Sequence, residues 1–212
     1  PHLFNDGVVL PKDGFATAAY NSVPLVMLTS SKEFSLFARS DPEFAAIKDE
    51  ELMANVERLR AYAFANDYGS KLYELFNAQE SAEAMFAGYK APIYTLRIGW
   101  GGNPAIVGER MAKVYGSFHG VWIPFVTSAT SGFSASFPAA FDNAGARDLS
   151  DKLGRYLGHF LRTGDPNGEG LVVWKPWESA TSGPTQLVGD ANAETAVFEM
   201  TEERARYDDV LA

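Results

Sequence analysis

The sequence contains no cysteine. This absence excludes a disulfide framework, a thiolate zinc site and a cysteine nucleophile. Basic residues are also scarce, because 18 Lys and Arg stand against 27 Asp and Glu and give a formal net charge of −9. Since such a surface repels phosphate backbones, we expect no nucleic-acid partner. No apolar run approaches the ~18 residues that a membrane-spanning helix needs, so we also expect no membrane span.

Apolar residues are plentiful enough for a sizeable core. The 212 residues are 46% hydrophobic and 13% aromatic, which suits one domain or most of one. Residues 23–29 and 92–98 predict buried strands, residues 149–161 predict an amphipathic helix, and 196–198 predict a weaker strand. Residues 66–70 (Asn-Asp-Tyr-Gly-Ser) predict a turn. Strands separated by helices indicate an α/β fold with a mainly parallel sheet, but two clear strands are few for a free-standing sheet.

A histidine at position 119 is the most informative single residue. It lies between Gly116 and Gly120 and precedes an apolar run over 121–126. Histidine changes charge near neutral pH, so His119 is either a catalytic base or a packed turn residue. The other two histidines, His2 and His159, lie far from it in the sequence, and we expect no metal cluster.

Seven segments, in order along nearly the whole chain, together resemble the type-B carboxylesterases, the cholinesterase-like branch of the α/β-hydrolases. The most specific are the His119 segment, Tyr-Gly-Ser-Phe-His-Gly followed by Ile-Pro-Phe-Val, and the run Phe-Leu-Arg-Thr-Gly-Asp-Pro-Asn. The seven segments are residues 6–11, 23–28, 30–37, 91–97, 115–126, 160–167 and 174–177. The resemblance implies an α/β-hydrolase fold and carboxylic ester hydrolysis through an acyl-enzyme, with a small-molecule ester as substrate and no cofactor.

The family's nucleophile has no counterpart in these 212 residues. That nucleophile lies in a Gly-x-Ser-x-Gly turn, and the nearest match here, residues 132–136, fails at its last position. The glycine loop of the oxyanion hole is missing too. The resemblance therefore implies that residues 1–212 are the C-terminal part of one catalytic domain. We expect an N-terminal segment, or a separate chain of the same protein, to complete the sheet and carry the serine.

The resemblance assigns two members of a catalytic triad to this chain. His119 would be the general base toward the serine and then the general acid toward the leaving alcohol, and Glu33 would orient it. Glu33 lies 86 positions before His119, in agreement with the order nucleophile, acid, histidine in α/β-hydrolases. The alternative for Glu33 is a solvated loop carboxylate.

Two residues depart from the family pattern. Phe34 stands where glycine follows the acid, and Trp122 stands where a carboxylate usually follows the histidine by three positions. Phe34, Phe118, Trp122 and Phe125 are candidates for a substrate pocket, with ordinary core aromatics as the alternative. The departures leave room for a second function, a non-catalytic cholinesterase-like binding or adhesion module, and for a third and weaker one, an inactive fragment.

Overall fold

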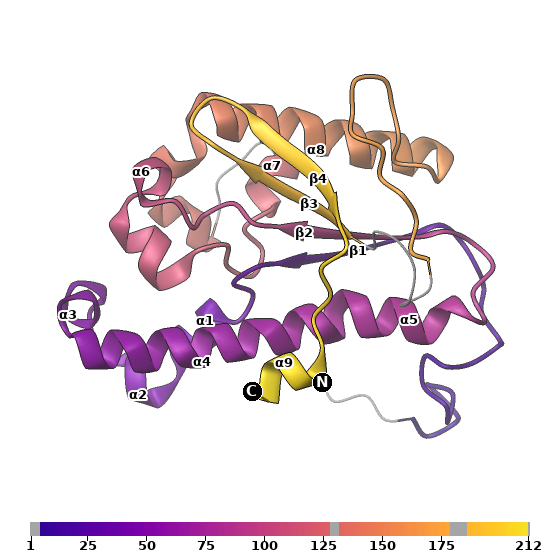
Figure 1. Cartoon of the computed structure of the whole chain (residues 1–212), viewed down its shortest axis with the longest axis horizontal. Coiled ribbons are helices and arrows are strands. Elements are labelled where there is room, and N and C mark those ends of the chain that lie inside the picture. The colour runs from indigo at the N-terminus through magenta and orange to yellow at the C-terminus, as the bar shows by residue number, and fades with distance from the viewer. Residues whose placement is uncertain (1–4, 128–131, 179–185, 212) are drawn as a thin grey trace.

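A four-stranded mixed sheet forms the centre of the molecule (Figure 1). The computed structural model describes residues 5–127, 132–178 and 186–211. The strands lie in the order β1 (Leu25–Ser30), β2 (Ile93–Ile98), β3 (Gln186–Ala191) and β4 (Ala196–Thr201). The first three run parallel, and β4 pairs antiparallel with β3. The strands predicted at 23–29, 92–98 and 196–198 are thus confirmed, and β3 is a further strand that the sequence pattern did not single out.

Helices cover both faces of this sheet (Figure 1). Along β2, Tyr94 lies on the face that carries α8, with its ring 6.2 Å from that of Phe160. Ile93 and Arg97 lie on the opposite face, against α5 and the end of α4. The remaining elements are α1 (Ser35–Ser40), α2 (Pro42–Ala45), α3 (Asp49–Ala54), α4 (Val56–Glu74), η1 (Leu75–Gln79), α5 (Glu80–Phe86), α6 (Pro104–Val107), η2 (Met111–Tyr115), α7 (Ile123–Thr127), η3 (Gly132–Ser136), η4 (Pro138–Phe141), α8 (Ala144–Thr163) and α9 (Tyr207–Leu211).

The turn predicted at residues 66–70 is wrong, because α4 runs through it as one helix of 19 residues. Gly69 is required there for close packing: a Cβ at this position would lie 2.2 Å from Cδ1 of Phe34. Asn66 and Ser70 are buried and hydrogen-bonded to each other through their side chains at 3.1 Å. Tertiary contacts thus override the turn preference of these residues.

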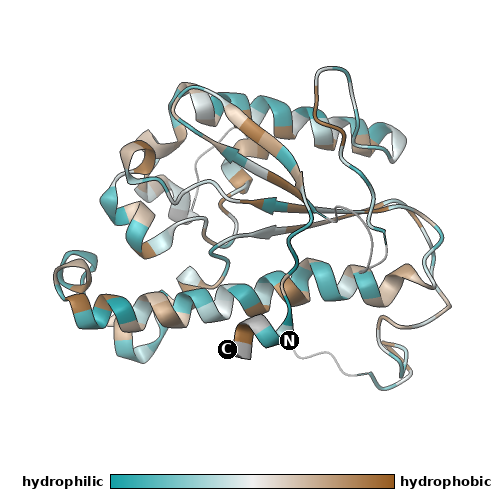
Figure 2. Ribbon diagram, viewed as in Figure 1, coloured by the Kyte–Doolittle hydropathy of each residue, from teal (hydrophilic) through white to brown (hydrophobic). Residues whose placement is uncertain are grey.

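The helix predicted over 149–161 is confirmed as part of α8, which begins five residues earlier and ends at Thr163. Asn143 caps it by accepting a hydrogen bond from the Ala146 amide at 2.8 Å, and Gly164 ends it in the left-handed conformation at a φ of 78°. Leu149 and Leu153 are fully buried against the sheet. Figure 2 shows hydrophilic and hydrophobic residues interspersed along α4 and α8, as expected of helices with one face toward a sheet.

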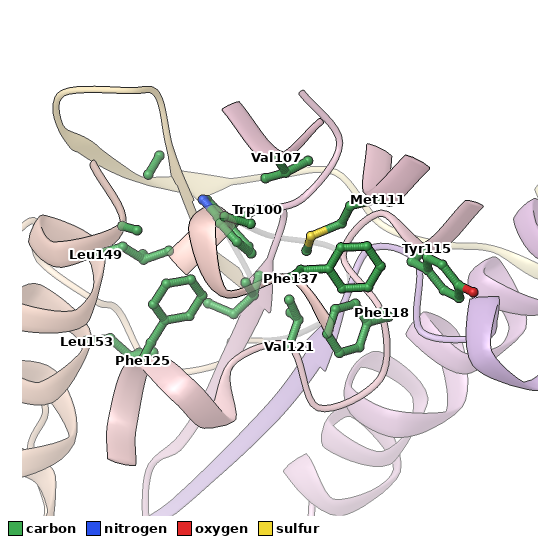
Figure 3. Packing of buried hydrophobic residues seen from close by; sticks show 14 of the residues in the cluster. Trp100, Val107, Met111, Tyr115, Phe118, Val121, Phe125, Phe137, Leu149 and Leu153 are labelled. Carbon is green, nitrogen blue, oxygen red and sulfur yellow. The ribbon is translucent and has the colours of Figure 1, made fainter. Parts of the chain in front are cut away.

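An aromatic core includes residues on either side of His119 in the sequence, among them Phe118 and Val121 (Figure 3). The rings of Trp100 and Phe125 meet edge to face with centroids 5.0 Å apart, and Phe118 and Val121 are buried beside them. Because such packing is dense, it fixes the backbone on either side of His119.

Candidate active site

Glu33 follows the carboxyl end of β1 by three residues. Its side chain is buried, and its Oε2 accepts a hydrogen bond from the Ser30 amide at 2.7 Å. Ligand sites in open α/β sheets form outside the carboxyl ends of the strands. Glu33 therefore lies at the edge of the sheet where such sites form.

The loop that carries His119 is bonded directly to the loop that carries Glu33. The Lys32 amide donates to the Ser117 carbonyl at 3.0 Å, and Lys32 and Phe118 form an isolated parallel bridge. The Ser117 hydroxyl donates to the Ile98 carbonyl at the end of β2. Gly116 adopts a φ of 55°, a conformation that side chains rarely allow. These contacts bring together two segments that lie far apart in the sequence.

The two predicted residues touch. Nδ1 of His119 is hydrogen-bonded to Oε1 of Glu33. The Glu33 side chain is 5% exposed and the His119 side chain 58% exposed. Such a bond to Nδ1 fixes the orientation of the ring and leaves Nε2 for proton transfer. Among the residues that the structure describes, no hydroxyl is hydrogen-bonded to this imidazole.

A cluster of three aromatic rings meets the imidazole through Phe37. The ring of Phe37 is 5.8 Å from that of His119, and it stacks on Tyr73 at 5.4 Å. Phe34 packs at 5.7 Å from both of these rings. The sequence motif contained Phe37 but gave it no role, and Tyr73, on α4, had no local signal that could have marked it.

The four candidate pocket residues fall into two groups. Phe118 and Phe125 are 2% and 3% exposed and belong to the core, as the alternative interpretation expects. Phe34 and Trp122 are only partly buried. Phe34 and Trp122 therefore keep some surface that a substrate could contact, whereas the two core rings keep almost none.

A separate cavity of about 670 Å³ lies outside the carboxyl ends of β2 and β3. Its lining includes Gly99, Asn103, Asp190 and Glu199, and it contains neither Glu33 nor His119. Burial raises the pKa of Asp190. The cavity is therefore distinct from the Glu33–His119 pair.

Over residues 5–127, 132–178 and 186–211, no group of three or more His, Asp or Glu is arranged to hold a metal ion. Within the same ranges, no helix combines the length and apolar character that crossing a membrane requires.

Known proteins resemble this chain in structure rather than in sequence. No protein-family model and no curated protein sequence matches it. The carboxylesterase EST55 of Geobacillus stearothermophilus matches with a TM-score of 0.56 at 19% identity, over 92% of this chain and 42% of its own. A thermophilic pNB esterase matches with a TM-score of 0.53 at 18% identity, over 94% of this chain and 41% of its own.

A third solved structure extends the comparison. An esterase from the anaerobe Clostridium hathewayi, which can hydrolyse aliphatic aromatic polyesters, matches with a TM-score of 0.51 at 15% identity, over 89% of this chain and 36% of its own. The chain therefore shares its fold with part of these α/β-hydrolase esterases. The chain spans less than half the length of these proteins.

Proposed function

We propose that this chain supplies the base and the orienting acid of a serine hydrolase that cleaves carboxylic esters of the type-B carboxylesterase kind. The observation that carries the proposal is the hydrogen bond between Glu33 Oε1 and His119 Nδ1. A buried carboxylate that holds an exposed imidazole is the arrangement that activates a hydroxyl nucleophile. The esterase fold of the chain agrees with this chemistry.

The reaction assigns each group one task. Glu33 holds the imidazole in one tautomer and stabilises its protonated form. Nε2 of His119 takes the proton of the serine as its oxygen attacks the ester carbonyl, and then gives that proton to the departing alcohol. Water attacks the resulting acyl-enzyme with the same imidazole as its base. The chemistry needs neither a metal nor a cofactor.

The nucleophile and the oxyanion donors belong, in this proposal, to a segment or chain outside these 212 residues. The 212 residues contain no Gly-x-Ser-x-Gly, and the chain covers only 42% of EST55. Within the described residues, β1 pairs with β2 alone, and Leu25 to Leu28 are only half-buried. An edge strand of this kind presents unpaired backbone groups, which a strand of the N-terminal segment would pair. Residues 1–212 are then the C-terminal part of one catalytic domain.

The rival function is a non-catalytic binding module, which the departures at Phe34 and Trp122 keep open. Both oxygens of Glu33 are engaged, one by the Ser30 amide and one by His119. A binding surface has no physical need for a buried carboxylate that holds an exposed imidazole. The geometry therefore favours the enzyme.

A serine-directed phosphonate tests the proposal on the intact protein. The reagent forms a stable bond with a serine that an imidazole activates, and digestion then identifies the labelled peptide. We expect one labelled serine, in a peptide outside residues 1–212, and no label in a His119→Ala variant. Absence of label, or label on a serine of this chain, contradicts the proposal.

A further inference from the structure

One buried carboxylate, that of Asp49, binds three side chains from different parts of the chain. Asp49 is the first residue of α3. Its carboxylate accepts hydrogen bonds from Arg39 Nε and Arg110 Nε at 2.8 Å and from the Tyr115 hydroxyl at 2.7 Å. Its side chain is 6% exposed. Burial alone would raise the pKa of Asp49, but the hydrogen bonds from Arg110, Arg39 and Tyr115 hold it below its usual range.

Two of these partners flank the candidate catalytic pair. Arg39 lies on α1, six positions after Glu33, and Tyr115 ends η2, four positions before His119. Asp49 thus joins the segment that follows the acid to the segment that precedes the histidine. Arg39 also donates to the carbonyls of Phe44 and Ile47, which holds its guanidinium in place.

A buried tyrosine makes the same connection a second time. The Tyr62 hydroxyl on α4 lies within hydrogen-bond distance of the Ser35 carbonyl at the start of α1 and of the Val114 carbonyl in η2. The side chain of Tyr62 is 0% exposed. Two independent polar side chains therefore span the same two segments.

We propose that Asp49 and Tyr62 are positioning residues, which set the distance between Glu33 and His119 by fixing α1 against η2. The role rests on the proposed function, because it matters for catalysis only if Glu33 and His119 are the catalytic pair. Neither residue contacts the imidazole, so each acts through the backbone of the loops that it anchors. A hydrogen-bonded pair keeps its strength only while its geometry is held.

Proton NMR of the His119 ring tests the positioning role without requiring turnover. The Nδ1–H proton, bonded to a carboxylate, gives a resonance far downfield, which a His119→Gln variant assigns by its loss. Replacing Tyr62 by Phe removes one hydroxyl and keeps the ring. We expect Tyr62→Phe to raise the exchange of this proton with water about tenfold, the population change expected when one hydrogen bond is lost. Asp49→Asn is expected to raise it further.

A matched control separates positioning from general stability. Tyr156 on α8 is equally buried, and its hydroxyl donates to the Val172 carbonyl at 2.7 Å. Tyr156→Phe is expected to lower the melting temperature as Tyr62→Phe does, with the His119 exchange rate unchanged. The positioning role is overturned if Tyr62→Phe and Asp49→Asn leave the exchange rate at its wild-type value, or if the wild-type spectrum lacks the resonance.

The two proposals fail in different ways. If the intact protein hydrolyses no ester while the exchange rate still responds to Tyr62→Phe, the proposed function is lost and the positioning of the pair stands. If the protein hydrolyses esters, the positioning role also predicts that Tyr62→Phe lowers kcat and leaves KM unchanged. A Tyr62→Phe variant with a higher KM and an unchanged kcat contradicts the positioning role.

Discussion

The ring of Phe34 rests directly on Gly69 of α4, so closely that a Cβ on Gly69 would lie 2.2 Å from Cδ1 and 2.3 Å from Cγ of the phenylalanine. The resemblance of the sequence motifs to those of type-B carboxylesterases implies a glycine at the position of Phe34. In this chain the bulky Phe34 side chain directly follows Glu33, and the absence of a side chain at Gly69 of α4 leaves room for it. Because Phe34 is the neighbour of Glu33 in the chain, this contact also fixes the loop that carries the acid.

Gly69→Ala is therefore expected to destabilise the protein, although alanine is the better helix former. The propensity gain is about 1 kcal/mol, and the cost of overpacking is about 1–3 kcal/mol, so we expect a net loss of about 1 kcal/mol in urea unfolding. Gly154→Ala on α8 is the matched control, because a Cβ there meets nothing within 4 Å. Gly154→Ala should stabilise the protein, and a Gly69→Ala variant that is equally stabilised contradicts the packing argument.

The ion pair between Asp148 and Lys152 is expected to stabilise the protein at neutral pH and to lose this contribution in acid. Hydrogen bonds from Lys152, the Ala196 amide and Thr195 lower the pKa of Asp148 to about 2. A carboxylate with a depressed pKa contributes stability above its unfolded value of 3.8, and this contribution is lost as pH falls toward 2. Because the side chain is 30% exposed, solvent screening reduces the contribution to about 1 kcal/mol.

Asp148→Asn should remove this contribution, as unfolding at pH 6 and pH 3 measures. The difference in unfolding free energy between wild type and variant is expected to shrink at the lower pH. A variant whose deficit is the same at both pH values contradicts the assignment.

Glu74 and Arg97 form a largely buried ion pair. The contribution of Glu74 to stability falls as pH rises, whereas that of Asp148 falls as pH decreases. Burial raises the pKa of Glu74 even though Arg97 lies 2.8 Å away and counteracts it. A carboxylate with a raised pKa destabilises the fold in its charged form, so stability falls as pH rises above 4.5 through the folded pKa. Arg97→Met leaves the charge unpaired and should cost about 3 kcal/mol at neutral pH.

Urea unfolding between pH 4 and pH 8 measures this effect. The fall in stability with rising pH should be steeper in Arg97→Met than in wild type, and a further Glu74→Gln substitution should remove the excess. A pH profile of Arg97→Met parallel to that of wild type rules out Glu74 as the cause.

The sequence predicted the elements whose signals are local. The strand over 23–29 has a continuous apolar run, the strand over 92–98 is rich in residues that favour strands, and α8 has both a regular apolar stripe and a glycine at its end. The turn expected at 66–70 is wrong because that stretch is buried against residues remote in sequence, such as Phe34, which packs on Gly69 and whose amide donates to the Ser70 hydroxyl. The strand predicted at 196–198 is longer than its apolar run, because β4 extends to Thr201 by pairing with Gln186 of β3.

The residues of the candidate site also differ in whether the neighbouring sequence marks them. Glu33 and His119 were marked by their motifs, and the structure brings them into contact. Phe37, Tyr73, Asp49 and Tyr62 were not, because their relation to the site exists only after α1, α4 and η2 have packed together. Long-range packing of this kind leaves no pattern in the neighbouring residues.

Ester turnover by a His119→Ala variant of the intact protein is the measurement that tests the central claim most directly. We expect kcat on a chromogenic ester to fall about 10⁴-fold or more, as loss of a triad base does, with a smaller fall in Glu33→Gln. His159→Ala, which changes a histidine of α8, should turn over at the wild-type rate. A His119→Ala variant that keeps near-normal kcat would show that this imidazole is not the base.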